Sequence, residues 1–357
     1  MKVLKGMGTG NNISGILFLD KRPGVTSFEA LRDIKRALGT GKVGHTGTLD
    51  KFAGGLLVVL TGRALKLGPW FTHCDKRYEG TIRFGAETDT LDNEGRITAE
   101  APVPEAAGVE ASLSRFRGRI LQVPPAWSAL RIGGRRASDL AREGKAPEMR
   151  ARPVHIYSLE LLSWEPPHAR IAVHCSGGTY IRSLARDIAL TAGSRGHLHA
   201  LTRTAVAGFP RSWGLDGGNL SPALVAASLR PPDRTVMAAL GLPVCEVNYD
   251  DVQRMICGKP LSSIIRGEPR REEGAYEPPE EDAGNQAGPA GDGNGAETGA
   301  PAPAVTGRRA VTACAAFCGP DLAGIVEGEP GGGGYHWRYG HVYAERSPVG
   351  NPGAGLR

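Results

Sequence analysis

The chain has 357 residues, of which 40% are hydrophobic, and a net charge of +6. This length is sufficient for two domains with substantial cores. No segment approaches the roughly 18 apolar residues that span a bilayer, and residues 1–12 lack the apolar region of a signal peptide. The six cysteines are scattered, which is typical of reduced thiols rather than a disulfide framework. We therefore expect a cytoplasmic protein without a membrane segment.

The charge is distributed unevenly along the chain. Residues 268–297 carry a net charge of −7, which leaves +13 on the remainder. A basic folded body is typical of a protein that binds a polyanion such as nucleic acid, although a basic protein without such a partner has the same balance. Residues 267–307 are rich in Gly, Pro, Glu and Ala and have almost no apolar anchor. We therefore predict that they form a disordered acidic insertion.

The predicted elements of residues 13–240 mix strands and helices without a regular β-α-β alternation, which favours an α+β fold over a doubly wound sheet. Thr26 and Glu29 form a capping-box pattern before a helix that Gly39 can end. The apolar repeat of this helix runs through Phe28, Leu31, Ile34 and Leu38. Further helices are predicted at 105–117, 136–143, 179–192, from 221 and at 235–239. Strands are predicted at 15–20, 56–60, 77–84, 154–162, 171–175 and 197–209.

Short strands and glycine turns replace this pattern from Leu242 onward. They are predicted at 244–248, 310–317, 322–327 and 335–344. This pattern indicates a small β domain over residues 241–345, interrupted by the acidic insertion. The tails 1–12 and 346–357 complete the predicted organisation. Cys314 and Cys318 are four residues apart without a second Cys/His pair at metal-binding spacing, so we expect no metal site.

Residues 44–50 read Gly-His-Thr-Gly-Thr-Leu-Asp and place a single acidic side chain, Asp50, at the end of a loop. Gly44 and Gly47 let the backbone take turns that other residues resist, and they let a ligand approach closely. The apolar run 56–60 then backs the loop with a buried strand. A carboxylate placed here can meet a substrate, although aspartate is also an ordinary turn or capping residue in such a loop.

Three further segments suit a flat, polar, anionic ligand. Lys76 and Arg77 stand beside Tyr78, a pattern that favours phosphate contact with base stacking but also occurs on edge strands without such a role. Arg182 lies in the first turn of a predicted helix, where the helix dipole disfavours a cation. Either an anionic partner or full solvation accounts for it. The glycine-arginine turn at 131–136 can hold a phosphodiester backbone, but alone it is better explained as a solvated basic turn.

At several stretches the sequence resembles the TruB family of tRNA pseudouridine synthases. These stretches follow the family's order and spacing between residues 13 and 210, and Gly-His-Thr-Gly-x-Leu-Asp is highly specific. The matching stretches are 15–21, 44–50, 75–78, 123–131, 152–154, 175–182 and 201–209. The resemblance therefore covers the predicted catalytic domain, 13–240.

The resemblance implies an enzyme that isomerises uridine to pseudouridine in tRNA, at uridine-55 of the T arm. It implies the pseudouridine synthase fold, a mixed and mostly antiparallel sheet flanked by helices. The C-terminal β domain resembles a PUA-type RNA-binding module loosely. No metal or organic cofactor is implied, and the target base must leave its stack. The implied partner is the T-arm stem-loop, bound by a monomer that has no obligatory protein partner.

The resemblance also implies the roles of individual residues. Asp50 is the nucleophile, because a carboxylate can add covalently and later leave. Tyr78 packs on the flipped base and assists proton removal at C5, and Leu201 lines the apolar side of the pocket. Arg182 pairs with Asp50 and keeps it ionised, while His45 stacks to hold the displaced RNA loop. The expected site further includes RNA contacts from Lys76 and Arg77 and structural support from Lys21, Gly44 and Gly47.

The chain departs from the family pattern at two positions. Arg22 separates Lys21 from Pro23, and Lys51 follows Asp50 where the family usually has proline. The charge of Lys51 can lower the pKa of Asp50 or contact phosphate. Two alternatives remain: a synthase that depends on guide RNA, and an RNA-binding or tRNA-folding chaperone with an idle site.

Overall fold

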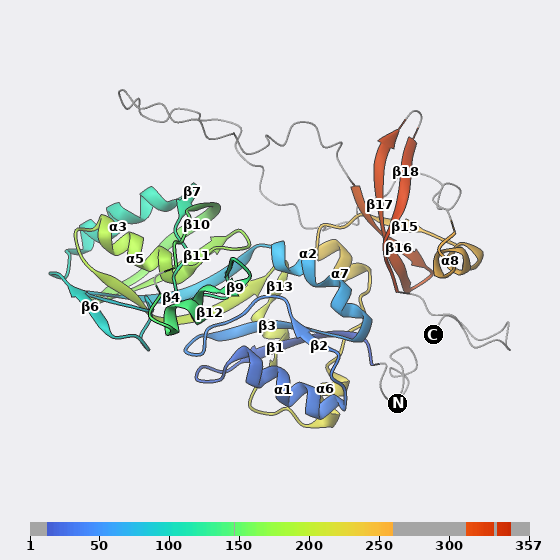
Figure 1. Cartoon of the computed structure of the whole chain (residues 1–357), viewed down its shortest axis with the longest axis horizontal. Coiled ribbons are helices and arrows are strands. Elements are labelled where there is room, and N and C mark those ends of the chain that lie inside the picture. Colours follow the sequence, from blue (N-terminus) through green and yellow to red (C-terminus); the bar gives the residue numbers. More distant parts are fainter. Residues whose placement is uncertain (1–12, 146, 260–311, 332–333, 344–357) are drawn as a thin grey trace. The chain divides into compact units, whose positions relative to one another are not determined.

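The computed structural model describes residues 13–145, 147–259, 312–331 and 334–343 (Figure 1). Contacts divide the chain into two units, one ending at Pro232 and the other beginning at Asp233. Helix α7 (Arg234–Ala239) thus falls in the second unit, whereas the predicted catalytic domain extended to residue 240. The predicted tails and the predicted insertion 267–307 lie outside the described residues. In the described part, no helix is long and apolar enough to cross a membrane.

A ten-stranded mixed sheet forms the centre of the first unit. Its strands are β1 (Gly15–Lys21), β2 (Val43–His45), β3 (Gly54–Thr61), β4 (Lys76–Phe84), β7 (Gly118–Gln122), β10 (Arg152–Glu165), β11 (His168–Cys175), β12 (Gly196–Val206), β13 (Phe209–Pro210) and β14 (Leu215–Asp216). They follow the order β14-β1-β3-β12-β4-β11-β10-β7, with β2 beside β3 and β13 beside β12. The pairs β1–β14 and β3–β12 are parallel and the others antiparallel. The predicted mixed, mostly antiparallel α+β fold is confirmed.

Helices and two small ribbons surround this sheet. The ribbons pair β5 (Ala86–Thr88) with β6 (Ile97–Glu100), and β8 (Arg131–Ile132) with β9 (Arg135–Arg136). The helices are α1 (Ser27–Leu38), α2 (Gly68–His73), α3 (Ala106–Leu113), α4 (Ala137–Arg142), α5 (Ile181–Thr191) and α6 (Pro222–Ala227). The predicted capping box of α1 is confirmed: Glu29 N donates to Thr26 Oγ1, and Thr26 N donates to the Glu29 carboxylate at 2.8 Å. Gly39 ends this helix in the left-handed region, with φ 62°.

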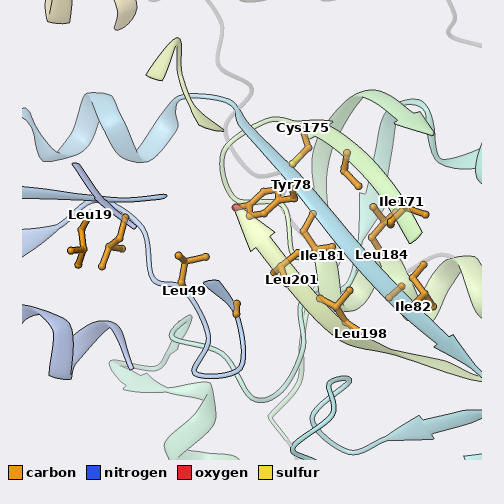
Figure 2. Close-up of a cluster of buried hydrophobic side chains, with 14 of the residues drawn as sticks. Leu19, Leu49, Tyr78, Ile82, Ile171, Cys175, Ile181, Leu184, Leu198 and Leu201 are labelled. Atoms are coloured by element: carbon orange, nitrogen blue, oxygen red, sulfur yellow. The ribbon is translucent and has the colours of Figure 1, made fainter. Parts of the chain in front are cut away.

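A continuous apolar core runs through the first unit. Figure 2 shows one part of it, where Ile82 and Ile171 of the sheet lie near Leu184 of α5. Phe28 differs from its prediction, because this residue of the expected apolar repeat is 72% exposed. Ser27 is buried instead, since its hydroxyl binds the backbone of Leu49 in the 44–50 loop.

The predicted strand 197–209 is in fact a hairpin of β12 and β13. Ala207 between them has a left-handed φ of 52°, and its N–H donates to the carbonyl of Asp75 at 2.9 Å. The stretch contains only Gly208 as a turn signal, so the sequence pattern did not reveal this break.

The second unit contains a four-stranded sheet in the order β15-β16-β17-β18. Its strands are β15 (Val244–Glu246), β16 (Thr312–Cys318), β17 (Asp321–Gly331) and β18 (Gly334–Val342), which confirms the predicted C-terminal β structure. Helix α8 (Tyr249–Ile256) was not predicted. Its signals are a capping box of Asn248 and Asp251 and the buried Val252 and Met255, which lie at helical spacing.

Candidate active site

Asp50 lies in the turn between β2 and β3, and backbone contacts from a second segment hold this turn. Ser27 Oγ, at the start of α1, accepts a hydrogen bond from Leu49 N (3.0 Å) and donates to Leu49 O (2.9 Å). Gly24 N donates to the carbonyl of Lys51 at 2.8 Å. Because these contacts lie on both sides of Asp50, the entry to α1 fixes the backbone that carries the carboxylate.

Arg182 contacts the Asp50 carboxylate through two of its nitrogens. Its Nε lies 2.9 Å from Oδ2 of Asp50, and its Nη2 lies 3.2 Å from Oδ1. Further guanidinium N–H groups donate to the carbonyls of Thr90 (2.8 Å) and Trp127 (2.9 Å). The Arg182 side chain is 6% exposed and that of Asp50 is 36% exposed. The cation is therefore enclosed, while the carboxylate that it orients stays open on one side.

Asp92 is a third member of this network, and the sequence had not revealed it. One of its oxygens lies 3.4 Å from Arg182 Nη1, and its side chain is 7% exposed. The other oxygen accepts hydrogen bonds from Thr90 Oγ1 (2.6 Å) and Glu94 N (3.1 Å). Asp92 lies in a stretch rich in Asp and Thr that reads as a polar turn, so only the fold distinguishes this carboxylate from its neighbours.

The surroundings of Asp50 act on its acidity in opposite directions. Burial raises the pKa of the Asp50 carboxyl above its ordinary value, the charge of Arg182 lowers it, and the charge of Asp92 raises it again. Lys21 lowers it as well. The carboxylate is thus partly stripped of water and yet faces an enclosed cation. Such a group suits nucleophilic attack on a substrate that enters from the open side.

Tyr78 of β4 and Leu201 of β12 form an apolar wall near this loop. Both are 8% exposed, and Figure 2 shows them together with Ile181. Burial raises the pKa of the Tyr78 phenol, whereas the charge of Arg203 lowers it. A flat ring and aliphatic carbons are the surfaces on which a planar base can stack.

His45 is half-buried at the end of β2. Its Nδ1 is enclosed and has no hydrogen-bond partner among the described residues. Burial, together with the charge of Arg203, lowers the pKa of His45 below the ordinary 6.5. Both effects favour the uncharged ring, which suits stacking rather than ion pairing.

Gly44 and Gly47 do not use the conformational freedom that was expected of them, because neither lies in the left-handed region. At Gly44 a side chain would come within 2.9 Å of Leu65, so its role is close approach. Gly47 contributes its carbonyl, which accepts a hydrogen bond from Arg203 Nη2 at 3.0 Å.

Lys21 supports the first strand from within the protein. It is 1% exposed, and its ammonium donates to the carbonyls of Val25 (2.6 Å) and Arg22 (3.1 Å). Burial lowers its pKa to about 8, against the raising effect of Asp50. The unusual Arg22 contacts both carboxylate oxygens of Asp216 on β14, at 3.0 and 2.8 Å. The departure from the family pattern therefore ties β1 to its neighbour and leaves Lys21 in place.

The structure separates Lys76 from Arg77, although the sequence had grouped them as RNA contacts. Lys76 is 7% exposed, and its ammonium donates to the carbonyls of Cys74 (2.5 Å), Thr72 (2.6 Å) and Phe71 (3.4 Å). Arg77 is exposed on the opposite side of β4. Lys76 thus satisfies carbonyls around the C-terminal end of α2 and is not placed for phosphate contact.

Lys76→Met should lower the free energy of unfolding by about 1–3 kcal/mol, because buried carbonyls lose their donor. Burial lowers the pKa of Lys76 from 10.5 to about 8. Between these values the folded chain binds fewer protons than the unfolded chain, so wild-type stability gains from this residue as the pH rises, and the variant loses that gain. Urea unfolding at several pH values measures both effects. Arg77→Met is the exposed control and should change stability by less than about 0.5 kcal/mol.

Lys51 faces Glu94, with 3.5 Å between its ammonium and the carboxylate and both side chains well exposed. Lys51→Gln should therefore change stability by less than about 0.5 kcal/mol. It should also leave the Asp50 pKa in place, because the cations that lower this pKa are Arg182 and Lys21. Carboxyl ¹³C NMR titration of Asp50 tests this expectation. An upward move of the Asp50 pKa in Lys51→Gln would contradict it, because it would show that the Lys51 charge lowers this pKa.

The glycine-arginine turn forms the β8–β9 ribbon, and its cations are exposed. Arg131 Nη1 donates to the carbonyl of Gly134 at 2.7 Å, and Arg135 pairs with Glu143. The ribbon lies in the same connection as Trp127, whose carbonyl accepts a hydrogen bond from Arg182. The segment that carries these exposed arginines is thus joined through the chain to the Asp50 network.

Solved structures share this fold. One is described as the crystal structure of a Cbf5-Nop10-Gar1 complex; it has a TM-score of 0.60 and 20% identity, over 92% of this chain and 84% of that chain. Another, an H/ACA RNP bound to a substrate RNA containing 2′-deoxyuridine, has a TM-score of 0.60 and 19% identity, over 93% and 86% of the two chains. At this identity the likeness concerns the fold alone.

Sequence relatives identify the family. Residues 35–181 match the model described as TruB family pseudouridylate synthase (N terminal domain). A protein of Bordetella avium named tRNA pseudouridine synthase B is 47% identical over 204 residues, which cover 56% of this chain and 84% of that protein. Its namesake in Francisella tularensis subsp. novicida is 45% identical over 196 residues, which cover 54% of this chain and 65% of that protein. The chain belongs to the TruB family, as the sequence motifs predicted.

Proposed function

We propose that this chain isomerises uridine to pseudouridine in tRNA, at uridine-55 of the T arm. The observation that carries the proposal is the half-open Asp50 carboxylate held by the enclosed Arg182, near the Tyr78–Leu201 wall. Relatives named tRNA pseudouridine synthase B support the choice of tRNA as substrate. We further propose that the chain acts as a cytoplasmic monomer without a protein partner or cofactor.

The chemistry assigns a role to each part of the site. The target uridine leaves its stack, and its ring rests on Tyr78 and Leu201. Asp50 adds covalently to the uridine, the N1–C1′ bond breaks, and the base turns so that C5 bonds to C1′. A proton leaves C5 and another joins N1, so product and substrate are isomers. Arg182 keeps Asp50 ionised before the attack. It stabilises the Asp50 carboxylate again when the covalent bond to the uridine breaks.

The remaining residues hold the RNA. We propose that the exposed arginines of the β8–β9 ribbon contact phosphates and that the uncharged His45 ring stacks in the space left by the flipped base. Arg77 is exposed and is proposed as a further RNA contact, whereas the buried Lys76 is not. Phosphate contacts release counterions, so binding should weaken steeply as salt rises.

Tritium release tests the proposed function. The purified chain is incubated alone with tRNA transcript tritiated at uridine C5, and release of tritium to water is followed at enzyme excess. Release that stops when uridine-55 is replaced supports the proposal. A folded sample that binds tRNA but releases no tritium would favour a chaperone with an idle site. Release that appears only after guide RNA and accessory proteins are added would favour a guide-dependent synthase.

A further inference from the structure

Arg203 is a second buried guanidinium near the proposed site, and its position differs from that of Arg182. It lies on β12 and is 3% exposed. Its Nε donates to the carbonyl of Leu56 at 2.7 Å, and its Nη2 donates to that of Gly47 at 3.0 Å. In the described part of the chain Arg203 has no carboxylate partner, whereas Arg182 has both Asp50 and Asp92.

Tyr78 is the side chain that Arg203 faces across the sheet. The two residues are direct partners in the antiparallel pairing of β12 and β4, so their side chains share a face. The charge of Arg203 lowers the pKa of the Tyr78 phenol. A guanidinium can only donate hydrogen bonds, so toward Arg203 the phenol oxygen can act only as an acceptor. A phenolate at this position would gain most from the neighbouring guanidinium.

The unpaired charge of Arg203 also affects other groups near the loop. It lowers the pKa of Tyr78, His45, Lys21 and Lys76. A buried cation without an anionic partner destabilises a protein, and an anion that forms beside Arg203 during function would relieve this effect. Tyr78 is the adjacent group that can become that anion.

We propose that Arg203 is a positioning residue for Tyr78, holding the phenol oxygen as a hydrogen-bond acceptor and stabilising the phenolate that removes the proton from C5. This inference rests on the proposed function. After C5 has bonded to C1′, the proton of the C5–H bond joins the Tyr78 oxygen. The electron pair of that bond forms C5=C6, the C6=N1 pair moves to N1, and N1 takes a proton from water. The phenol then returns its proton to the solvent, and no oxidant or reductant is needed.

The first test needs no RNA and therefore fails independently of the proposed function. Position 78 carries 3,5-difluorotyrosine, and ¹⁹F NMR follows its ionisation in the otherwise unchanged full chain and in Arg203→Gln. The midpoint should move upward by about one pH unit or more when the guanidinium is removed. Arg203→Lys, which keeps the charge but not the planar fork, should show a smaller move in the same direction. An unchanged midpoint in a folded variant overturns the inference. If Arg203→Gln does not fold, the ionisation midpoint is compared between wild type and Arg203→Lys, and an unchanged midpoint overturns the inference.

The second test separates an effect of Arg203 on the acidity of Tyr78 from a purely structural role of Arg203. With tyrosine at position 78, Arg203→Gln should slow single-turnover tritium release near neutral pH by about 10²-fold. The more acidic difluorotyrosine at position 78 should restore much of this loss in the same variant. A merely structural role for Arg203 would weaken tRNA binding or thermal stability and would not be rescued by a more acidic phenol. Lack of rescue in a variant that still folds and binds tRNA overturns the inference, whereas lack of release by the wild type overturns the proposed function instead.

Discussion

Asp50→Asn should reduce tritium release from C5-labelled tRNA by at least about 10⁴-fold while leaving tRNA affinity largely unchanged. The amide cannot act as the nucleophile, because its nitrogen is a donor and its oxygen is a poor attacking group. The Arg182 contact survives in part, since Nε or Nη2 can still donate to the amide oxygen. Single-turnover release and filter binding on the same preparations measure the two quantities.

Asp92→Asn is the matched control for that experiment. It removes a carboxylate from the same guanidinium, at 3.4 Å from Nη1, but from the enclosed side. We expect a loss of about 10²-fold, typical of a misplaced catalytic group, rather than complete loss. Removal of the Asp92 charge should also lower the Asp50 pKa, so the acid limb of the pH–rate profile should move to lower pH. Equal losses of tritium release in Asp50→Asn and Asp92→Asn would contradict the assignment of Asp50 as the nucleophile and Asp92 as a supporting residue.

Arg182→Met should lower the free energy of unfolding by about 3 kcal/mol, because it leaves Asp50 and Asp92 without their cation and two carbonyls without their donor. This figure is at the low end of the range for broken buried pairs, since Asp50 is partly exposed to solvent. Tritium release should fall as strongly as in Asp50→Asn, because the carboxylate loses its orientation. Urea unfolding of wild type and variant at one pH measures the first effect.

The pH dependence of Arg182→Met gives a second readout. The folded-state pKa of Asp50 already lies above its ordinary value, and loss of the Arg182 charge should raise it further. The folded chain then binds more protons than the unfolded chain between the two pKa values, so stability declines as pH rises through this window. The double variant Arg182→Met/Asp92→Asn should recover part of the loss, since one uncompensated charge is gone. If the double variant is as unstable as the sum of its parts, Asp92 and Arg182 are not coupled.

Local sequence patterns predicted the elements that position the site. The Thr26–Glu29 capping box and Gly39 delimited α1, and apolar runs predicted β1 and β3. These signals act between near neighbours, so the sequence displays them directly. The same reasoning misplaced Phe28, because burial at the start of α1 depends on the contact of Ser27 with Leu49, 22 residues away.

The network around Asp50 depends on contacts between distant residues. Arg182 meets Asp50 across 132 positions of sequence, and Arg203 meets Gly47 across 156. The motif made Asp50 and Arg182 candidates, but neither Asp92 nor Arg203 has a local signal that separates it from an ordinary polar residue. Lys76 is the opposite case, a residue whose local sequence signal was misleading. Its sequence neighbours suggested phosphate contact, but in the fold its ammonium donates to backbone carbonyls.

The sequence by itself determined the family, the order of elements and the acidic residue at the end of the 44–50 loop, because motif and periodicity are local properties of the chain. Only the tertiary structure decided which charges face one another. A cation on α5 and a carboxylate on the β2–β3 turn become an ion pair when the sheet brings them together. A side chain's exposure and charged partners, which set its pKa, exist only in the folded state. This is why Arg182 orients Asp50, Arg203 faces Tyr78, and Lys76 supports a helix end.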